Sequence, residues 1–96
     1  MVHKMKNQDV ADAFAEGSNF GASGNMFIEG NAIYSYGHHF PIAYRIGGKV
    51  YFNSQGYSTT TSIHKGRVLR ALASRGINVE MRTTEQLQRM IEEKTC

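Results

Sequence analysis

The sequence predicts an α+β fold, a four- to five-stranded antiparallel sheet with helices packed on one face, in the order α-β-β-β-β-α-β-α. Two glycine-containing turns divide residues 26–53 into short segments that alternate apolar and polar side chains, as hairpins do. Residues 57–76 then repeat apolar side chains at helical spacing and end at Gly76. With 96 residues, the chain is expected to form a single domain (1–96) with one modest core.

The first quarter of the chain is expected to form one helix and a flexible connection. Residues 1–6 predict a frayed basic leader. Asn7 is a good cap for a helix over residues 8–16, which Gly17 ends. Residues 17–25 are rich in glycine and serine and are interpreted as a linker. The alternative, a glycine-rich loop whose backbone approaches a ligand, lacks the strand that normally precedes a phosphate-binding loop.

The middle of the chain predicts four strands, at residues 26–29, 32–36, 41–46 and 49–53. The pairs Gly30-Asn31 and Gly47-Gly48 suit two-residue hairpin turns. Alternation along the last two strands predicts one apolar face, formed by Ile42, Tyr44, Ile46, Val50 and Phe52.

A fifth strand and a final helix are predicted after Gly76. Residues 77–82 alternate apolar and polar side chains, as an edge strand does. Thr83 or Thr84 then caps a helix that runs to about residue 94, and Thr83 and Gln86 have capping-box spacing. The buried stripe of this helix is expected to be Leu87, Met90 and Ile91.

The start of the central helix has the composition of an anion site. Residues 58–62 are all Ser or Thr, which favour helix caps, and free N–H groups and the positive end of the helix dipole attract anions there. Arg67 and Arg70 are expected on the outer face. The alternative is that the hydroxyls only cap the helix and the arginines only contact solvent. The candidate ligand-binding residues of this segment are Tyr57, Ser58, Thr60, Thr61, Ser62, His64, Arg67 and Arg70.

Charge is segregated along the chain. No Asp or Glu lies between Glu29 and Glu80, and this interval contains Arg45, Lys49, Lys65, Arg67, Arg70 and Arg75. The net charge of the whole chain is +3. A basic segment of this kind favours an anionic partner, such as nucleic acid, a nucleotide or an acidic protein surface.

Aromatic side chains lie in the same acid-free interval. Tyr34 and Tyr36 are two residues apart on one strand, so alternation places both on one face, where paired rings can stack on bases. His38 is a further candidate for stacking. The alternative is that the tyrosines cover the core, since tyrosine is common in strands.

Enzymatic and metal chemistry are not expected. His64 is close in sequence to several hydroxyls, but the interval has no acid to orient it as a catalytic base. A donor to a phosphate or to a strand carbonyl is the simpler role for His64. His38 and His39 point in opposite directions on an extended chain, and no zinc-like spacing is present. We predict no catalytic residue, metal or cofactor, and no internal disulfide, because Cys96 is the only cysteine.

Part of the chain has a recognisable motif pattern. Tyr-Ser-Tyr-Gly at 34–37 and His-Phe-Pro at 39–41 precede Tyr-Ser at 57–58, Thr-Thr-Ser at 60–62 and His64. Over residues 26–72 this resembles short proteins of unknown function encoded by bacteriophages and archaeal viruses. A third threonine, Thr59, is a small departure from the pattern. The resemblance implies a viral gene product that acts inside the infected cell, and implies nothing about catalysis.

These observations predict a small non-enzymatic viral binding module that holds nucleic acid or a nucleotide. The alternative is a viral inhibitor that docks on an acidic surface of a host defence or nucleic-acid-handling protein, with Ile63 and Phe40 as apolar anchors. No apolar run reaches the length of a membrane span, so the expected location is the cytoplasm of the infected host cell. A homodimer paired through the fifth strand is a further option.

Overall fold

The computed structural model describes residues 6–56 and 59–95. Within these residues the chain forms three helices and six strands. Of the frayed leader predicted over residues 1–6, only Lys6 is described, as the cap residue of α1. The predictions for Tyr57, Ser58 and Cys96 lie outside the described residues. In chain order the elements are α1 (Asn7–Ala15), β1 (Phe20–Ala22), β2 (Met26–Glu29), β3 (Ala32–Ser35), β4 (Pro41–Ile46), β5 (Lys49–Asn53), α2 (Thr59–Ser74), β6 (Val79–Arg82) and α3 (Thr84–Thr95).

The six strands lie in the sheet in chain order, from β1 at one edge to β6 at the other. Each neighbouring pair from β1 to β5 is antiparallel, but β6 is parallel to β5. The prediction of a wholly antiparallel sheet is therefore wrong at its last strand. The reason is α2, which connects β5 to β6 and returns the chain across the sheet, so that the new strand runs in the old direction.

The segment predicted as a flexible linker contains strand β1. Phe20 pairs with Glu29 and Ala22 with Phe27, so β1 continues the sheet beyond β2. The N–H of Met26 then donates to Ser23 Oγ at 3.0 Å, which orders the turn between the two strands. The interpretation of residues 17–25 as a linker is wrong here, because backbone pairing with β2 makes a strand of a segment without a strand-like side-chain pattern.

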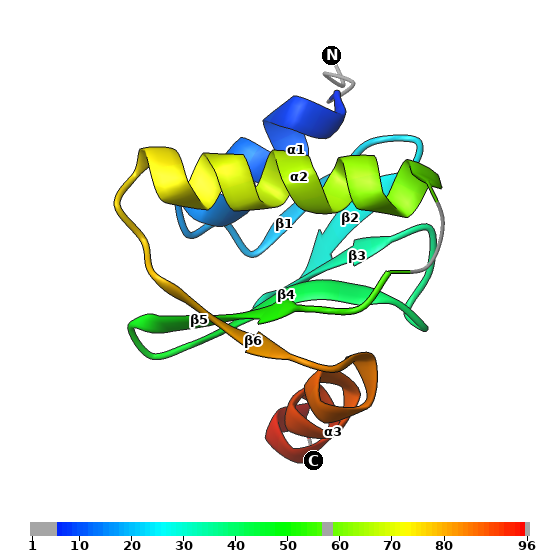
Figure 1. Ribbon diagram of the computed structural model, residues 1–96, viewed down its shortest axis with the longest axis vertical. Helices are drawn as coiled ribbons and strands as arrows, with labels where there is room; N and C mark the ends of the chain where they lie inside the picture. Colours follow the sequence, from blue (N-terminus) through cyan, green and yellow to red (C-terminus); the bar gives the residue numbers. More distant parts are fainter. Residues whose placement is uncertain (1–5, 57–58, 96) are drawn as a thin grey trace.

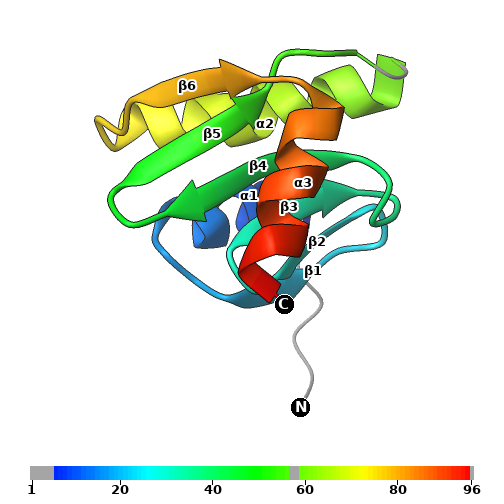
Figure 2. The same cartoon turned by 90° about the horizontal axis from the view of Figure 1, so that it is seen from below.

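Helices cover both faces of the sheet. The helices α1 and α2 lie against each other over one face, whereas α3 crosses the opposite face (Figures 1 and 2). The prediction of helices on one face is therefore wrong for α3. All four residues of β3 are buried, which means that this strand is covered on both sides. The smaller core, under α3, is formed by Ala32, Tyr34, Tyr44 and Leu87, with Met90 and Ile91 packed against it.

The hairpin between β4 and β5 determines which side chains share a face. Ile46 pairs with Lys49, which places Tyr44 opposite Tyr51. Directly opposed residues point to the same side of a sheet, and both tyrosines belong to the core under α3. The predicted single apolar face is therefore wrong for Tyr44 and Ile46. The other members of that predicted face lie under α1 and α2, and they are Ile42, Val50 and Phe52.

The sequence signals for the end of α2 and the start of α3 gave correct predictions. The N–H of Thr83 donates to Gln86 Oε1 at 2.8 Å, and the N–H of Gln86 donates to Thr83 Oγ1 at 3.2 Å. This confirms the capping box of α3. Gly76 has a φ of +70°, which confirms a left-handed residue after α2. Asn7 does not cap α1 but is its first residue, and Lys6 occupies the cap position.

Candidate functional site

The hydroxyl residues at the start of α2 separate into exposed and buried groups. Thr60 and Ser62 are exposed, whereas Thr61 has a relative exposure of 1 %. Thr61 Oγ1 lies 3.3 Å from Ser35 Oγ at the end of β3. Thr60 and Ser62 are therefore accessible to a ligand at the helix start, while Thr61 joins the helix to the sheet.

His64, one turn further along α2, is the centre of a buried polar network. Its Nδ1 lies 2.8 Å from Ser35 Oγ, and its Nε2 lies 3.4 Å from Asn7 Nδ2. Because Asn7 Oδ1 accepts a hydrogen bond from Ser23 Oγ, the amide nitrogen of Asn7 is left to donate to His64. We therefore assign the proton of neutral His64 to Nδ1, which donates to Ser35.

The burial of His64 changes the role that the sequence suggested. Burial lowers its pKa, and the charge of Arg67 lowers the pKa further, so the ring is neutral at pH 7. Both ring nitrogens are engaged inside the protein, and the residue is 1 % exposed. The predicted contact with a phosphate or a strand carbonyl is therefore wrong, since its partner on the strand is the Ser35 hydroxyl. The network joins α1, β3 and α2.

Tyr36 and Tyr34 do not share a face. Tyr34 is 4 % exposed and belongs to the core under α3. Tyr36 follows β3 directly, is 53 % exposed, and its ring centroid lies 5.5 Å from that of His64, on the α2 side. Tyr36 has a φ of +67°, a left-handed conformation that turns the backbone out of the strand and breaks the alternation. The predicted pair of stacking rings is wrong, and Tyr36 is the ring available beside α2.

His38 lies on the opposite side of the sheet from the start of α2. Its Nε2 is 3.0 Å from both carboxylate oxygens of Glu29, and its ring centroid is 4.9 Å from that of Tyr34. The predicted site residues therefore form two regions. His38 and Tyr34 lie beside α3, whereas the candidates of α2 and Tyr36 lie together on the other face.

Acidic residues from the flanking segments neutralise part of the basic interval. Arg75, just beyond α2, lies 3.5 Å from Asp12 and 3.0 Å from Glu16 of α1. Lys49 lies 3.4 Å from Glu80 of β6. The segregation seen along the sequence therefore does not produce one continuous basic surface.

Three cations on α2, Lys65, Arg67 and Arg70, have no carboxylate partner within the described part of the chain. Arg70 is exposed. Lys65 Nζ donates to the carbonyl of Gln55 at 2.7 Å, and partial burial lowers its pKa. Arg67 Nη1 donates to Gln8 Oε1 of α1 at 3.3 Å, and its buried Nε has no hydrogen-bond partner among these residues. The prediction that Arg67 lies on the outer face with Arg70 is therefore wrong, because its side chain turns towards α1.

The two apolar anchors considered for a protein partner have different surroundings. Ile63 is 53 % exposed, beside the cations of α2. Phe40 is 3 % exposed and packs in the larger core, so it is not an anchor. Lys65 was not among the predicted site residues, because a spacing of five residues from Arg70 is about 140° around a helix and does not place the two on one face.

Within residues 6–56 and 59–95, no group of three or more His, Cys, Asp or Glu side chains is arranged to hold a metal ion. None of the helices in that part of the chain is long and apolar enough to cross a membrane. Comparison of the chain with known protein families, with curated proteins and with solved structures gives no match.

Proposed function

We propose that this protein is a small viral binding module without enzymatic activity, which holds nucleic acid or a nucleotide against the first half of α2. One observation carries the proposal. Lys65, Arg67 and Arg70 have no carboxylate partner among the described residues, whereas Arg75 at the far end of the helix is paired with two acids. The viral origin in this proposal comes from the sequence resemblance alone.

The proposed mechanism is positioning and charge neutralisation of phosphate. The exposed hydroxyls of Thr60 and Ser62 donate to phosphate oxygens at the positive end of the helix dipole, and Arg70 contributes a full charge. The exposed ring of Tyr36 offers a platform for one base. Such contacts read the backbone of a nucleic acid and not its sequence, so affinity is expected to fall steeply with salt.

Arg70→Glu is expected to weaken the binding of a labelled single-stranded oligonucleotide about tenfold or more, since a charge-assisted contact contributes roughly 1.5–3 kcal/mol. Fluorescence anisotropy at low and moderate salt measures this loss. Arg70 is the better target than Arg67, whose side chain contacts α1. The matched control is Arg89→Glu, which changes the charge equally on α3, where Arg89 lies 3.3 Å from Glu85. Equal weakening by both variants, or affinity that does not change with salt, would contradict the proposal.

Tyr36→Gly separates the role of the ring from that of the backbone. Glycine accepts the φ of +67° without steric cost, so the free energy of unfolding should change by no more than about 1 kcal/mol. Loss of base stacking should weaken oligonucleotide binding about fivefold or more. Urea denaturation and anisotropy on the same variant measure the two effects. Unchanged affinity would limit the proposal to phosphate contacts.

A second candidate function is docking on an acidic surface of a host protein. The observation that favours it is the exposure of Ile63 and Tyr36, each 53 % exposed, beside the cations of α2. Ile63→Ser should abolish capture of a host protein from a lysate but leave oligonucleotide affinity within about twofold, because Ile63 makes no phosphate contact. Purified protein that binds oligonucleotide alone favours the first function, and capture of a host protein without oligonucleotide binding favours the second.

A further inference from the structure

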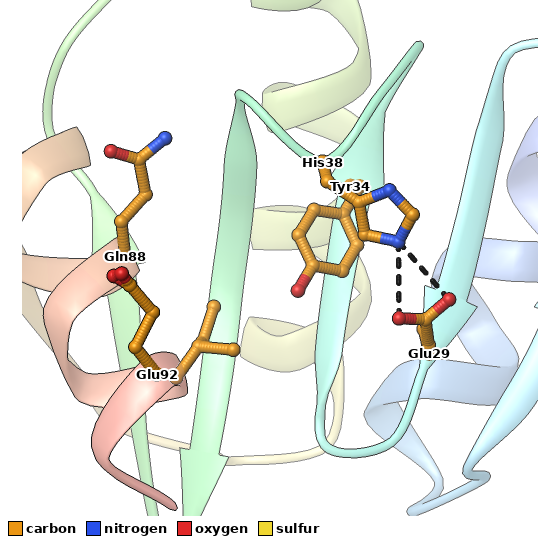
Figure 3. Close-up of a pocket in the computed structure, with 6 residues that line it drawn as sticks. Glu29, Tyr34, His38, Gln88 and Glu92 are labelled. Carbon is orange, nitrogen blue, oxygen red and sulfur yellow. Dashed lines mark hydrogen bonds and ion pairs between the residues drawn. The ribbon is translucent and has the colours of Figure 1, made fainter. Parts of the chain in front are cut away.

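A pocket of about 460 Å³ opens between the sheet and α3, on the face opposite to α2. Figure 3 shows Glu29 and His38 on the sheet side, Gln88 and Glu92 on the α3 side, and Tyr34 between them. A second hollow shares Glu29, Tyr34 and Ile91 with this pocket, so the two adjoin along α3. None of the residues that line this pocket belongs to α2, where the proposed nucleic-acid site lies.

The hydroxyl of Tyr34 is the most informative group in the pocket. The residue is 4 % exposed, and its hydroxyl forms no hydrogen bond within the described part of the chain. The hydroxyl is directed towards the α3 side of the pocket (Figure 3). Among the described residues only Arg67 Nε is both fully buried and without a hydrogen-bond partner, so the Tyr34 oxygen is open to the pocket, where a bound molecule can reach it.

The polar groups around this hydroxyl are mostly hydrogen-bond acceptors. Glu29 accepts from His38 Nε2 at 3.0 Å, and a carboxylate can accept further hydrogen bonds. Gln88 Nε2 donates to the carbonyl of His39 at 2.9 Å, which leaves Oε1, an acceptor, as its other polar atom. Glu92 adds a second carboxylate from α3. The pocket therefore has a carboxylate on each wall, and the Glu29 carboxylate is in contact with His38.

Two ring side chains, Tyr34 and His38, line the sheet side of the pocket, and Phe27 supports them from outside its lining. The rings of Phe27 and Tyr34 are stacked with centroids 5.0 Å apart, and His38 lies 4.9 Å from Tyr34 and 5.1 Å from Phe27. Tyr34 is 4 % exposed and stacked on Phe27, so the exposed ring next to the carboxylates is that of His38, whose side chain is 63 % exposed. A guanidinium group can stack on such a ring and donate in pairs to carboxylates.

We propose that this pocket binds a small organic cation, an alkylguanidinium or alkylammonium group, between Tyr34 and the carboxylates of Glu29 and Glu92. The N–H groups of the cation donate to the Tyr34 oxygen and to the two carboxylates, and its alkyl chain lies against Ile91. This site is on the opposite face of the sheet from the proposed nucleic-acid site, so either can exist without the other.

The test uses n-butylguanidinium as the probe. Pentanoate and n-butanol, an anion and a neutral compound with the same n-butyl chain, are the comparison compounds. In ¹H–¹⁵N correlation spectra of the full chain, the probe is expected to shift backbone resonances of β2, of residues 36–39 and of α3. Its affinity should exceed that of either comparison compound at least tenfold. Equal binding of the three compounds, shifts spread over α2, or no binding of the probe would overturn the proposal.

Two variants test the named contacts. Tyr34→Phe keeps the ring and should weaken probe binding about two- to tenfold, through loss of one hydrogen bond. Glu92→Gln should weaken it about tenfold, through loss of a charge-assisted contact. The control Glu93→Gln removes the same charge from the neighbouring exposed residue, which does not line the pocket. A loss in Glu93→Gln equal to that in Glu92→Gln, or full affinity in both test variants with native spectra, would overturn the proposal.

Discussion

Replacement of Phe14 by alanine is expected to lower the free energy of unfolding by about 3–5 kcal/mol. Phe14 is 0 % exposed and lies in the larger core, between α1 and the sheet. The guanidinium carbon of Arg45 lies 4.5 Å from the centroid of its ring, and Arg45 Nη2 donates to the carbonyl of Phe14. The substitution therefore opens a cavity and also removes the surface on which Arg45 stacks. Urea denaturation followed by circular dichroism measures the change.

The matched control for this prediction is Phe20→Ala. Phe20 on β1 is 79 % exposed, so the same substitution should change the free energy of unfolding by no more than about 0.5 kcal/mol. Similar costs for the two variants would show that α1 does not pack on the sheet as described.

Stability is expected to fall as the pH is lowered from 7.5 to 5.5, and His64 is expected to cause much of the change. The pKa of His64 is lowered in the folded state, so below pH 6.5 the unfolded chain binds a proton that the folded chain does not. The stabilisation is fully present above the unfolded pKa and is lost as the pH falls towards the folded pKa. The maximal slope is about 1.4 kcal/mol per pH unit. Urea titrations at several pH values measure it.

His64→Gln tests this assignment. The substitution should remove most of the slope between pH 7.5 and 5.5, and it should destabilise the protein at pH 7.5 by about 1–3 kcal/mol, because the buried Ser35 hydroxyl loses a well-placed partner. If His64→Gln retained the wild-type pH dependence, another group would be responsible.

Local signals in the sequence predicted most of the fold. The turns at Gly30 and Gly47, with φ values of +63° and +59°, were readable because a two-residue hairpin needs a residue that tolerates positive φ. The Gly47-Gly48 turn implied that Tyr44 lies opposite Tyr51, so the face of Tyr44 was available from the sequence. The face of Ile42 was not, because it depends on a register shift between β3 and β4. The direction of β6 was also available, since a long helix between adjacent strands is typical of a parallel crossover. Strand β1 was not, because only its pairing with β2 defines it.

The candidate site depended more on tertiary structure. His64 is buried because Ser35 and Asn7, 29 and 57 residues away in the chain, supply its hydrogen bonds. A local sequence pattern cannot identify hydrogen-bond partners that are so far away along the chain. The loss of the continuous basic surface has the same origin, because the acids that pair with Arg75 come from α1. The exposed hydroxyls of α2 and the position of Arg70 were predictable because they depend only on helical spacing.

The order of strands in the sheet has a consequence for solubility. An open sheet ends in two strands with unpaired backbone groups, which invite a strand from another molecule. Here both ends are short, with three residues in β1 and four in β6. Along β6, Glu80 pairs with Lys49, and the guanidinium carbon of Arg82 lies 4.9 Å from the centroid of the Tyr51 ring. A strand added there would have to align beside these charges, which opposes fibrous aggregation through the β6 edge.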